Sequence, residues 1–136
     1  MTKTLLLRIA SVISFLFAAG HSLGGLTDWS PMGDNEVLRA MKAVRFEAMG
    51  ASRTYYDFYI GFGHSVSVAM LLQSVLLWQL ATIAKAGTVS VRPMIGALIV
   101  GSAVNGLVAW LFIFPLAAAF SLVLTACLVA AFLVGR

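Results

Sequence analysis

Charged side chains are scarce in this chain. Asp, Glu, Lys and Arg make up only 10% of its 136 residues, whereas 61% are hydrophobic and the mean hydropathy is +0.99. Globular proteins in water carry about 25% charged residues. The composition therefore excludes an ordinary water-soluble surface and predicts that lipid surrounds most side chains. We expect the net charge of +4 to reflect loop residues that set topology and contact anionic headgroups, not nucleic acid.

Cysteine is almost missing as well. Cys127 is the only one, so the sequence predicts no intramolecular disulfide and no cysteine-based metal site. No histidine motif has the spacing of a zinc site. The glycines around His64 resemble a phosphate-binding loop, but no Lys-Ser/Thr pair follows them, and this excludes a nucleotide site of that type.

Four apolar stretches are long enough to cross a bilayer. The first, residues 4–26, would reach about 34 Å as a helix, against a hydrocarbon core of about 30 Å. Its start resembles a secretory signal, but the apolar run continues to Leu26, which favours a retained helix. The others are residues 53–84, 93–112 and 116–134. The sequence predicts an all-α integral membrane protein, a four-transmembrane-helix bundle that forms one membrane domain over residues 1–136.

The only long polar segment, residues 28–52, separates the first two spans. Ser30 and Pro31 are typical of a helix start and Gly50 of a helix end. Between them, apolar residues recur at helical spacing at Val37, Met41, Val44 and Ala48. This pattern predicts an amphipathic helix in the membrane interface.

Lys and Arg residues give a modest topology signal. With four spans, both termini share one side, which holds five basic residues against four on the other. The five are Lys3, Arg8, Lys85, Arg92 and Arg136, and the four are Arg39, Lys42, Arg45 and Arg53. The excess favours a multi-pass protein of the cell membrane with both termini cytoplasmic.

Small and polar residues predict which face of each span contacts its neighbours. The sets at helical spacing are Ser11, Ser14, Ala18, His21 and Gly25; Asp57, Gly61, His64 and Val68; Ala97, Gly101, Asn105 and Ala109; and Ala117, Ser121 and Thr125. Almost no polar residue lies between the last two spans, which predicts a close antiparallel pair. The same spacing permits a homo-oligomer.

Titratable groups at membrane depth are costly and indicate a functional site. We expect a pocket for a lipid-like amphipathic ligand, such as an isoprenoid, quinone, sterol-like molecule or phospholipid. Its predicted residues are His21, Arg53, Tyr56, Asp57, His64 and Asn105. Asp57 and His64 are the candidate catalytic pair, because an imidazole near neutral pKa exchanges protons readily. Membrane lipid is the expected partner, and the cofactor, if any, is unknown.

Three alternatives stay open at this point. In the first, the cluster is structural: Arg53 pairs with Asp57 one turn away, each histidine bonds a neighbouring helix, and the protein is a structural or partner-binding subunit. In the second, His21 and His64 hold a metal or the two faces of a haem. In the third, the protein transports protons or a small solute.

Overall fold

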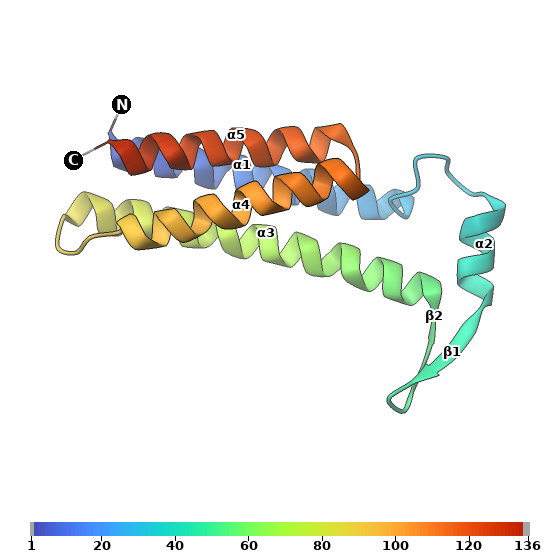
Figure 1. Ribbon diagram of the computed structural model, residues 1–136. Helices are drawn as coiled ribbons and strands as arrows, with labels where there is room; N and C mark the ends of the chain where they lie inside the picture. The colour runs from blue at the N-terminus through green and yellow to red at the C-terminus, as the bar shows by residue number, and fades with distance from the viewer. Residues whose placement is uncertain (1, 135–136) are drawn as a thin grey trace. The chain divides into compact units, whose positions relative to one another are not determined.

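The computed structural model describes residues 2–134 and is mostly helical (Figure 1). The elements are α1 (Lys3–Gly24), the 3-10 helix η1 (Gly25–Thr27), α2 (Glu36–Ala43), β1 (Arg45–Ala48), β2 (Ala51–Thr54), α3 (Tyr55–Ala86), α4 (Arg92–Phe112) and α5 (Pro115–Leu133). Four helices are long and apolar enough to span a membrane: α1 continued by η1, α3, α4 and α5. The predicted helical architecture is confirmed at this level.

The chain divides into two compact units. One unit combines Met1–Phe17 with Leu71–Arg136, and the other is Ala18–Met70. Both α1 and α3 contribute to each unit, because the division falls within these helices.

The first unit has a continuous apolar core. Its fully buried large side chains are Leu7, Leu77, Ile95 and Leu128, one from each of the four long helices. Beside this core, the Ser11 hydroxyl donates to the Ser74 carbonyl (2.8 Å) and the Ser74 hydroxyl donates back to the Ser11 carbonyl (2.9 Å). These reciprocal bonds satisfy two buried hydroxyls and fix how α1 lies along α3.

Helices α4 and α5 form the close antiparallel pair that the sequence predicts, joined by a short turn (Figure 1). The Asn105 amide donates to Ser121 (3.0 Å), and Thr125 donates to Ser102 (2.8 Å). A Cβ at Gly106 would lie 3.2 Å from the Ser121 Cβ. Glycine at this position therefore lets the two backbones approach closely.

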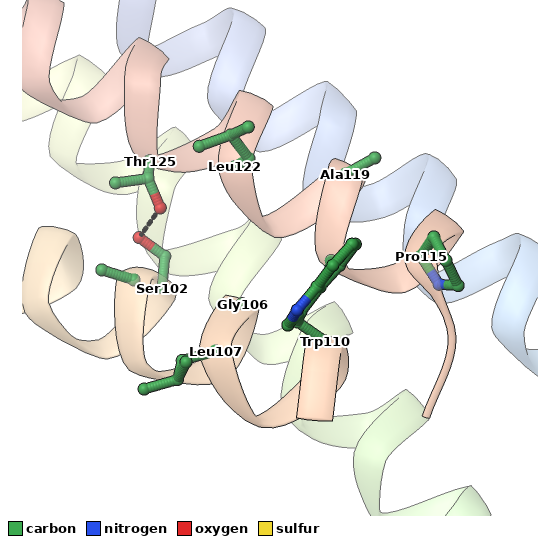
Figure 2. A pocket seen from close by; sticks show the side chains of 10 residues that line it. Ser102, Gly106, Leu107, Trp110, Pro115, Ala119, Leu122 and Thr125 are labelled. Carbon is green, nitrogen blue, oxygen red and sulfur yellow. Dashed lines mark hydrogen bonds between the residues drawn. The ribbon is translucent and has the colours of Figure 1, made fainter. Parts of the chain in front are cut away.

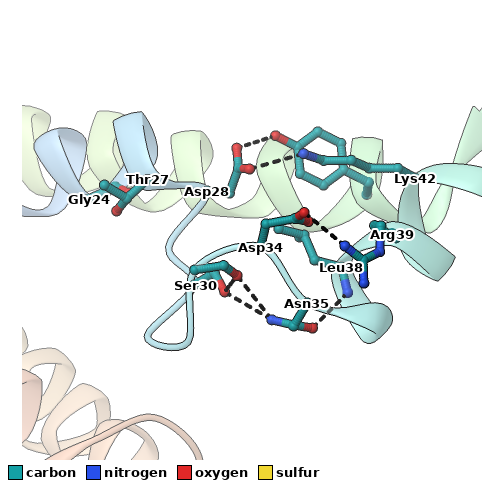
Figure 3. Close-up of polar contacts among 11 residues, drawn as sticks. Gly24, Thr27, Asp28, Ser30, Asp34, Asn35, Leu38, Arg39 and Lys42 are labelled. Atoms are coloured by element: carbon teal, nitrogen blue, oxygen red, sulfur yellow. Dashed lines mark hydrogen bonds and ion pairs between the residues drawn. The ribbon is translucent and has the colours of Figure 1, made fainter.

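The second unit contains a shorter helix than the sequence predicts. Helix α2 begins after Asn35, whose side-chain oxygen accepts from the Leu38 amide (3.0 Å), so Asn35 and not Ser30 is the cap (Figure 3). The helix ends at Ala43, and Val44 is already extended. Leu38 is the buried apolar residue of α2, whereas Val37, on the predicted face, is 70% exposed.

The remainder of the predicted helix is a β-hairpin, so this part of the prediction is wrong. Strands β1 and β2 pair antiparallel from Arg45↔Thr54 to Ala48↔Ala51. The two turn residues, Met49 and Gly50, have φ of 50° and 81°, as two-residue hairpin turns require. Gly50 is therefore a turn residue and not a helix cap. The Phe46 ring packs on Tyr55 and Phe58, with centroids 5.0 and 5.2 Å away, and this aromatic packing favours the strand over a helical turn.

The predicted contact faces are confirmed on α1 and α5, confirmed only in part on α4, and wrong on α3. On α3 the predicted residues Asp57, Gly61, His64 and Val68 are all exposed. The less exposed stripe lies one residue away, at Ile60, Gly63, Ser67, Met70, Ser74, Leu77 and Ala81. One residue is about 100° of rotation on a helix. On α4, Ala97, Gly101 and Asn105 are exposed, whereas the predicted Ala109 is buried, as is Ser102. Every face of these helices carries small residues, so their spacing did not single out one face.

Candidate functional site

Trp29 occupies the centre of the polar end of the second unit. After η1 the chain reverses through Asp28 and Trp29, whose φ values of 56° and 46° are left-handed. The Trp29 amide donates to the Gly24 carbonyl (3.0 Å), which closes this reversal at the end of α1. The indole is thereby turned back along the helix, where its Nε1–H donates to the His21 carbonyl (2.7 Å).

Three glycines leave room for the Trp29 indole. A Cβ would lie 2.7 Å from the nearest ring atom at Gly24, 3.0 Å at Gly25 and 2.5 Å at Gly63. Gly24 and Gly25 belong to the end of α1 and η1, and Gly63 belongs to α3. The indole therefore lies in a niche where Gly24 and Gly63 leave no room for a Cβ and Gly25 leaves little. Tyr59 adds an edge-on ring contact at 6.4 Å, and its hydroxyl donates to the Trp29 carbonyl (2.9 Å).

Both predicted histidines contact this indole. The ring centroids of His21 and Trp29 are 5.2 Å apart, and those of His64 and Trp29 are 5.1 Å apart. His21 is half-buried, and its Nδ1 lies 2.9 Å from the Ser67 hydroxyl. His64 is exposed, and within residues 2–134 no hydrogen bond reaches its imidazole. The two histidines therefore differ in their hydrogen bonding: His21 is bonded to Ser67 on α3, whereas the ring nitrogens of His64 are available to a ligand.

Asp57 and Arg53 do not form the ion pair that the structural alternative assumes. The Asp57 carboxylate accepts from the Thr54 amide (2.7 Å), and the Thr54 hydroxyl accepts from the Asp57 amide (3.0 Å). This reciprocal arrangement caps the start of α3. The exposed Arg53 guanidinium donates to the neighbouring Ser52 carbonyl (2.8 Å). Asp57 lies about 10 Å from His64 along α3, so direct proton exchange between them would need a bridging group.

Tyr56 belongs to a second polar cluster, which joins the loop, α2 and α3. One Asp28 carboxylate oxygen accepts from the Tyr56 hydroxyl (2.5 Å), and the other accepts from the Lys42 ammonium (3.0 Å). The Lys42 ammonium also lies over the Tyr56 ring, 4.5 Å from its centroid. The hydroxyl bond from Tyr56 and the bond from Lys42 lower the pKa of Asp28 below its usual value. This Asp28 cluster (Asp28, Lys42 and Tyr56) holds the connection in place and already uses the Tyr56 hydroxyl.

Asn105 lies in the first unit, whereas the other five predicted residues lie in the second. It is exposed, and its amide bonds Ser121 on α5. Near it, α4 and α5 enclose an open groove with a volume of about 520 Å³. Figure 2 shows its mainly apolar lining, with Trp110 on one wall and the bonded Ser102–Thr125 pair on α4 and α5. The sequence analysis did not foresee this groove.

Sequence reasoning also missed Trp29 as the central residue of the site. The available signal was steric: Gly24, Gly25 and Gly63 interrupt apolar helices close to the two histidines. Glycine within a helix reduces stability by about 1 kcal/mol relative to alanine, so several together indicate that something large must fit against the backbone. Within residues 2–134, no group of three or more His, Cys, Asp or Glu side chains is placed to hold a metal ion.

No protein-family model, curated protein or solved structure matches this chain. The fold and the site therefore define a class and not a named activity: a mostly helical protein with four helices that could span a membrane and two histidines packed on one tryptophan. Its function has to be argued from these residues.

Proposed function

We propose that the protein is a four-span bundle in the cell membrane that binds a lipid-like amphipathic ligand at the Trp29 site, defined as His21, Trp29, Tyr59 and His64. One observation carries the proposal. His64 presents an exposed imidazole, with no hydrogen bond from the described chain, on the mainly apolar helix α3. An ionisable side chain in such a position is costly unless a partner satisfies it.

The length of α3 suggests where this imidazole lies. A helix over Tyr55–Ala86 is about 48 Å long, against a hydrocarbon core of about 30 Å. Its first turns should therefore project into the headgroup region. His64 lies about 14 Å from the start of α3, near the proposed boundary between headgroups and acyl chains. An amphipathic molecule has its polar group and its tail at this depth.

The surroundings of His64 suit both parts of such a ligand. The imidazole can donate to or accept from a hydroxyl, carbonyl or phosphate group. The neighbouring Phe62 and Val68 on α3 are 67% and 66% exposed, and they offer apolar contact to a tail. Arg53 would hold a headgroup only if that headgroup extended to the outer end of α3. We propose the predicted orientation, with both termini cytoplasmic, on the basis of the Lys and Arg distribution.

A structural or partner-binding subunit is the second candidate, and a specific contact favours it. The His21 imidazole hydrogen-bonds Ser67, and the His21 carbonyl accepts from Trp29. This histidine therefore holds α1 against α3 without any ligand. A haem held by His21 and His64 would require Trp29 to move, since its ring contacts both imidazoles. Catalysis by Asp57 and His64 would require a substrate that bridges the distance between them.

The test is ligand retention by purified protein in mild detergent, measured by native mass spectrometry. The probes are phosphatidylethanolamine, decylubiquinone and farnesol at equal concentration. We expect the wild type to retain one of them, and His64→Leu to lose that adduct by about tenfold or more, because the imidazole supplies its polar contact.

Ser65→Ala is the matched control. Ser65 is the exposed neighbour of His64, and its hydroxyl donates to the Gly61 carbonyl of its own helix (2.8 Å), so its loss should leave retention unchanged. Circular dichroism and thermal unfolding would verify that both variants are folded. Equal retention by His64→Leu and wild type, or no retained probe in folded wild type, would overturn the ligand proposal and leave the structural candidate.

A further inference from the structure

Arg8 lies on α1 in the first unit and forms no ion pair with the side chains that the structure describes. Its guanidinium carbon lies 5.0 Å from the centroid of the Trp78 ring on α3. Its Nε is buried and has no hydrogen-bond partner among residues 2–134. The ion pairs of the described residues are Arg39–Asp34 and Lys42–Asp28. A buried donor on a charged group is costly to leave unsatisfied, and an anion beside the guanidinium would offset part of this cost.

The distribution of acidic residues shows that the first unit has no carboxylate side chain to supply that ligand. All five acidic residues of the sequence fall in the second unit, at Asp28, Asp34, Glu36, Glu47 and Asp57. The segments of the first unit carry Lys3, Arg8, Lys85, Arg92 and Arg136. An anion that paired with Arg8 would therefore have to come from outside the side chains of this unit.

We propose that Arg8 and Trp78 form a binding site for the phosphate of an anionic membrane lipid. Arginine stacks on aromatic faces and presents a planar fork of donors that matches a phosphate. Arg8 lies about 8 Å from the start of α1, within reach of the headgroup region for a long side chain. Leu5 and Val12, one turn before and after Arg8, are 46% and 48% exposed, and they provide apolar contact for the acyl chains.

This proposal concerns a different site from the Trp29 site. It rests on the proposed membrane insertion but not on ligand binding at His64. The test compares phosphatidylglycerol with phosphatidylcholine of identical acyl chains, because the two differ in headgroup charge. Native mass spectrometry in a neutral detergent measures which lipid the protein retains.

The decisive variants are Arg8→Gln and the matched control Arg92→Gln. Arg92 belongs to the same unit and lies over the Phe132 ring at 4.2 Å, so both variants remove one stacked positive charge. We expect wild type and Arg92→Gln to prefer phosphatidylglycerol by about tenfold, and Arg8→Gln to lose most of this preference. Arg8→Lys keeps the positive charge but not the planar fork of donors. Its preference for phosphatidylglycerol should therefore be about threefold weaker than that of wild type.

Three results would overturn the proposal. They are equal retention of the two lipids by wild type, an unchanged preference in Arg8→Gln, and equal loss in Arg8→Gln and Arg92→Gln. If Arg8→Gln fails to fold, the lipid preference of Arg8→Lys is compared with that of wild type, and an unchanged preference would overturn the proposal. A parallel titration with inorganic phosphate separates the two sources of the same chemistry: stabilisation by millimolar phosphate equal to that by phosphatidylglycerol would assign the site to a free anion and overturn the lipid assignment.

Discussion

The imidazole of His64 meets the indole of Trp29 edge to face, with ring centroids 5.1 Å apart and planes inclined at 69°. The contact joins α3 to the loop that follows η1, within one compact unit. Only glycine at position 63 allows the indole to lie close to the α3 backbone. Packing around this one ring therefore controls how the His64 side chain is presented.

The first prediction concerns the two glycines on either side of Phe62. Gly63→Ala should reduce the free energy of unfolding by about 1–3 kcal/mol, because its Cβ would lie 2.5 Å from a rigid indole. Gly61→Ala should be neutral or stabilising by up to about 1 kcal/mol, since no atom of residues 2–134 beyond the adjoining helix backbone lies within 4 Å of the added Cβ. Thermal unfolding in detergent compares the two. Equal effects of both variants would contradict the niche.

A second variant tests the same packing in reverse. If Gly63→Ala destabilises the protein through a clash with the indole, it should reduce the free energy of unfolding much less in a Trp29→Leu background than in wild type. A double-mutant cycle on unfolding free energies measures that coupling. Additive effects would show that Gly63→Ala acts through something other than Trp29.

The next prediction concerns acidification of the Asp28 cluster. The Tyr56 hydroxyl and the Lys42 ammonium lower the pKa of Asp28, so the folded state favours the carboxylate. The stabilisation is therefore present above the ordinary pKa of about 3.8 and is lost as the pH falls through the lower, folded value. Hydrogen exchange of the α2 amides should be constant from neutral pH down to about 4, after correction for intrinsic rates, and faster below. Asp28→Asn should remove this acid step, and Asp34→Asn, whose ion pair is exposed, should keep it.

The four long helices were predictable from this sequence, whereas the faces by which they contact one another were predictable only in part. Length and hydropathy alone give four apolar helices, and the scarcity of polar residues between α4 and α5 gives their pairing. The contact face of α3 could not be located, because Gly61 and His64 have the helical spacing expected of an interior stripe and yet are exposed. A single residue of register separates that stripe from the buried one.

The polar connection shows a different limit. Val37, Met41 and Val44 satisfy a helical period, but a hairpin requires only two residues that accept positive φ. Met49 gives no sequence signal for that conformation, and Gly50 reads equally well as a helix cap. The role of Trp29 depends on a backbone reversal at Asp28, which side-chain patterns do not encode.

Met49 provides a prediction about the hairpin itself. Its φ of 50° is left-handed, a conformation that costs most side chains about 1 kcal/mol and that asparagine tolerates better. Met49→Asn should therefore slow hydrogen exchange of the β1 and β2 amides. Ala51→Asn, placed in β2 where asparagine is unfavourable, should not slow it. Faster exchange in Met49→Asn would contradict this. It would show that the exposed Met49 side chain stabilises the hairpin by more than the left-handed backbone at this position destabilises it.

The final prediction separates the two sides of the proposed membrane. Cys127 is the only cysteine, so Cys127→Ser provides a background for single labels. Met49→Cys marks the hairpin, and Val89→Cys marks the loop between α3 and α4, where Val89 is 63% exposed. In intact cells, a membrane-impermeant maleimide should label Met49→Cys and spare Val89→Cys, because one crossing by α3 separates them and both termini are proposed to be cytoplasmic. Permeabilised cells provide the control, in which both should react. Labelling of Val89→Cys alone would reverse the orientation, and labelling of both in intact cells would contradict a membrane crossing by α3.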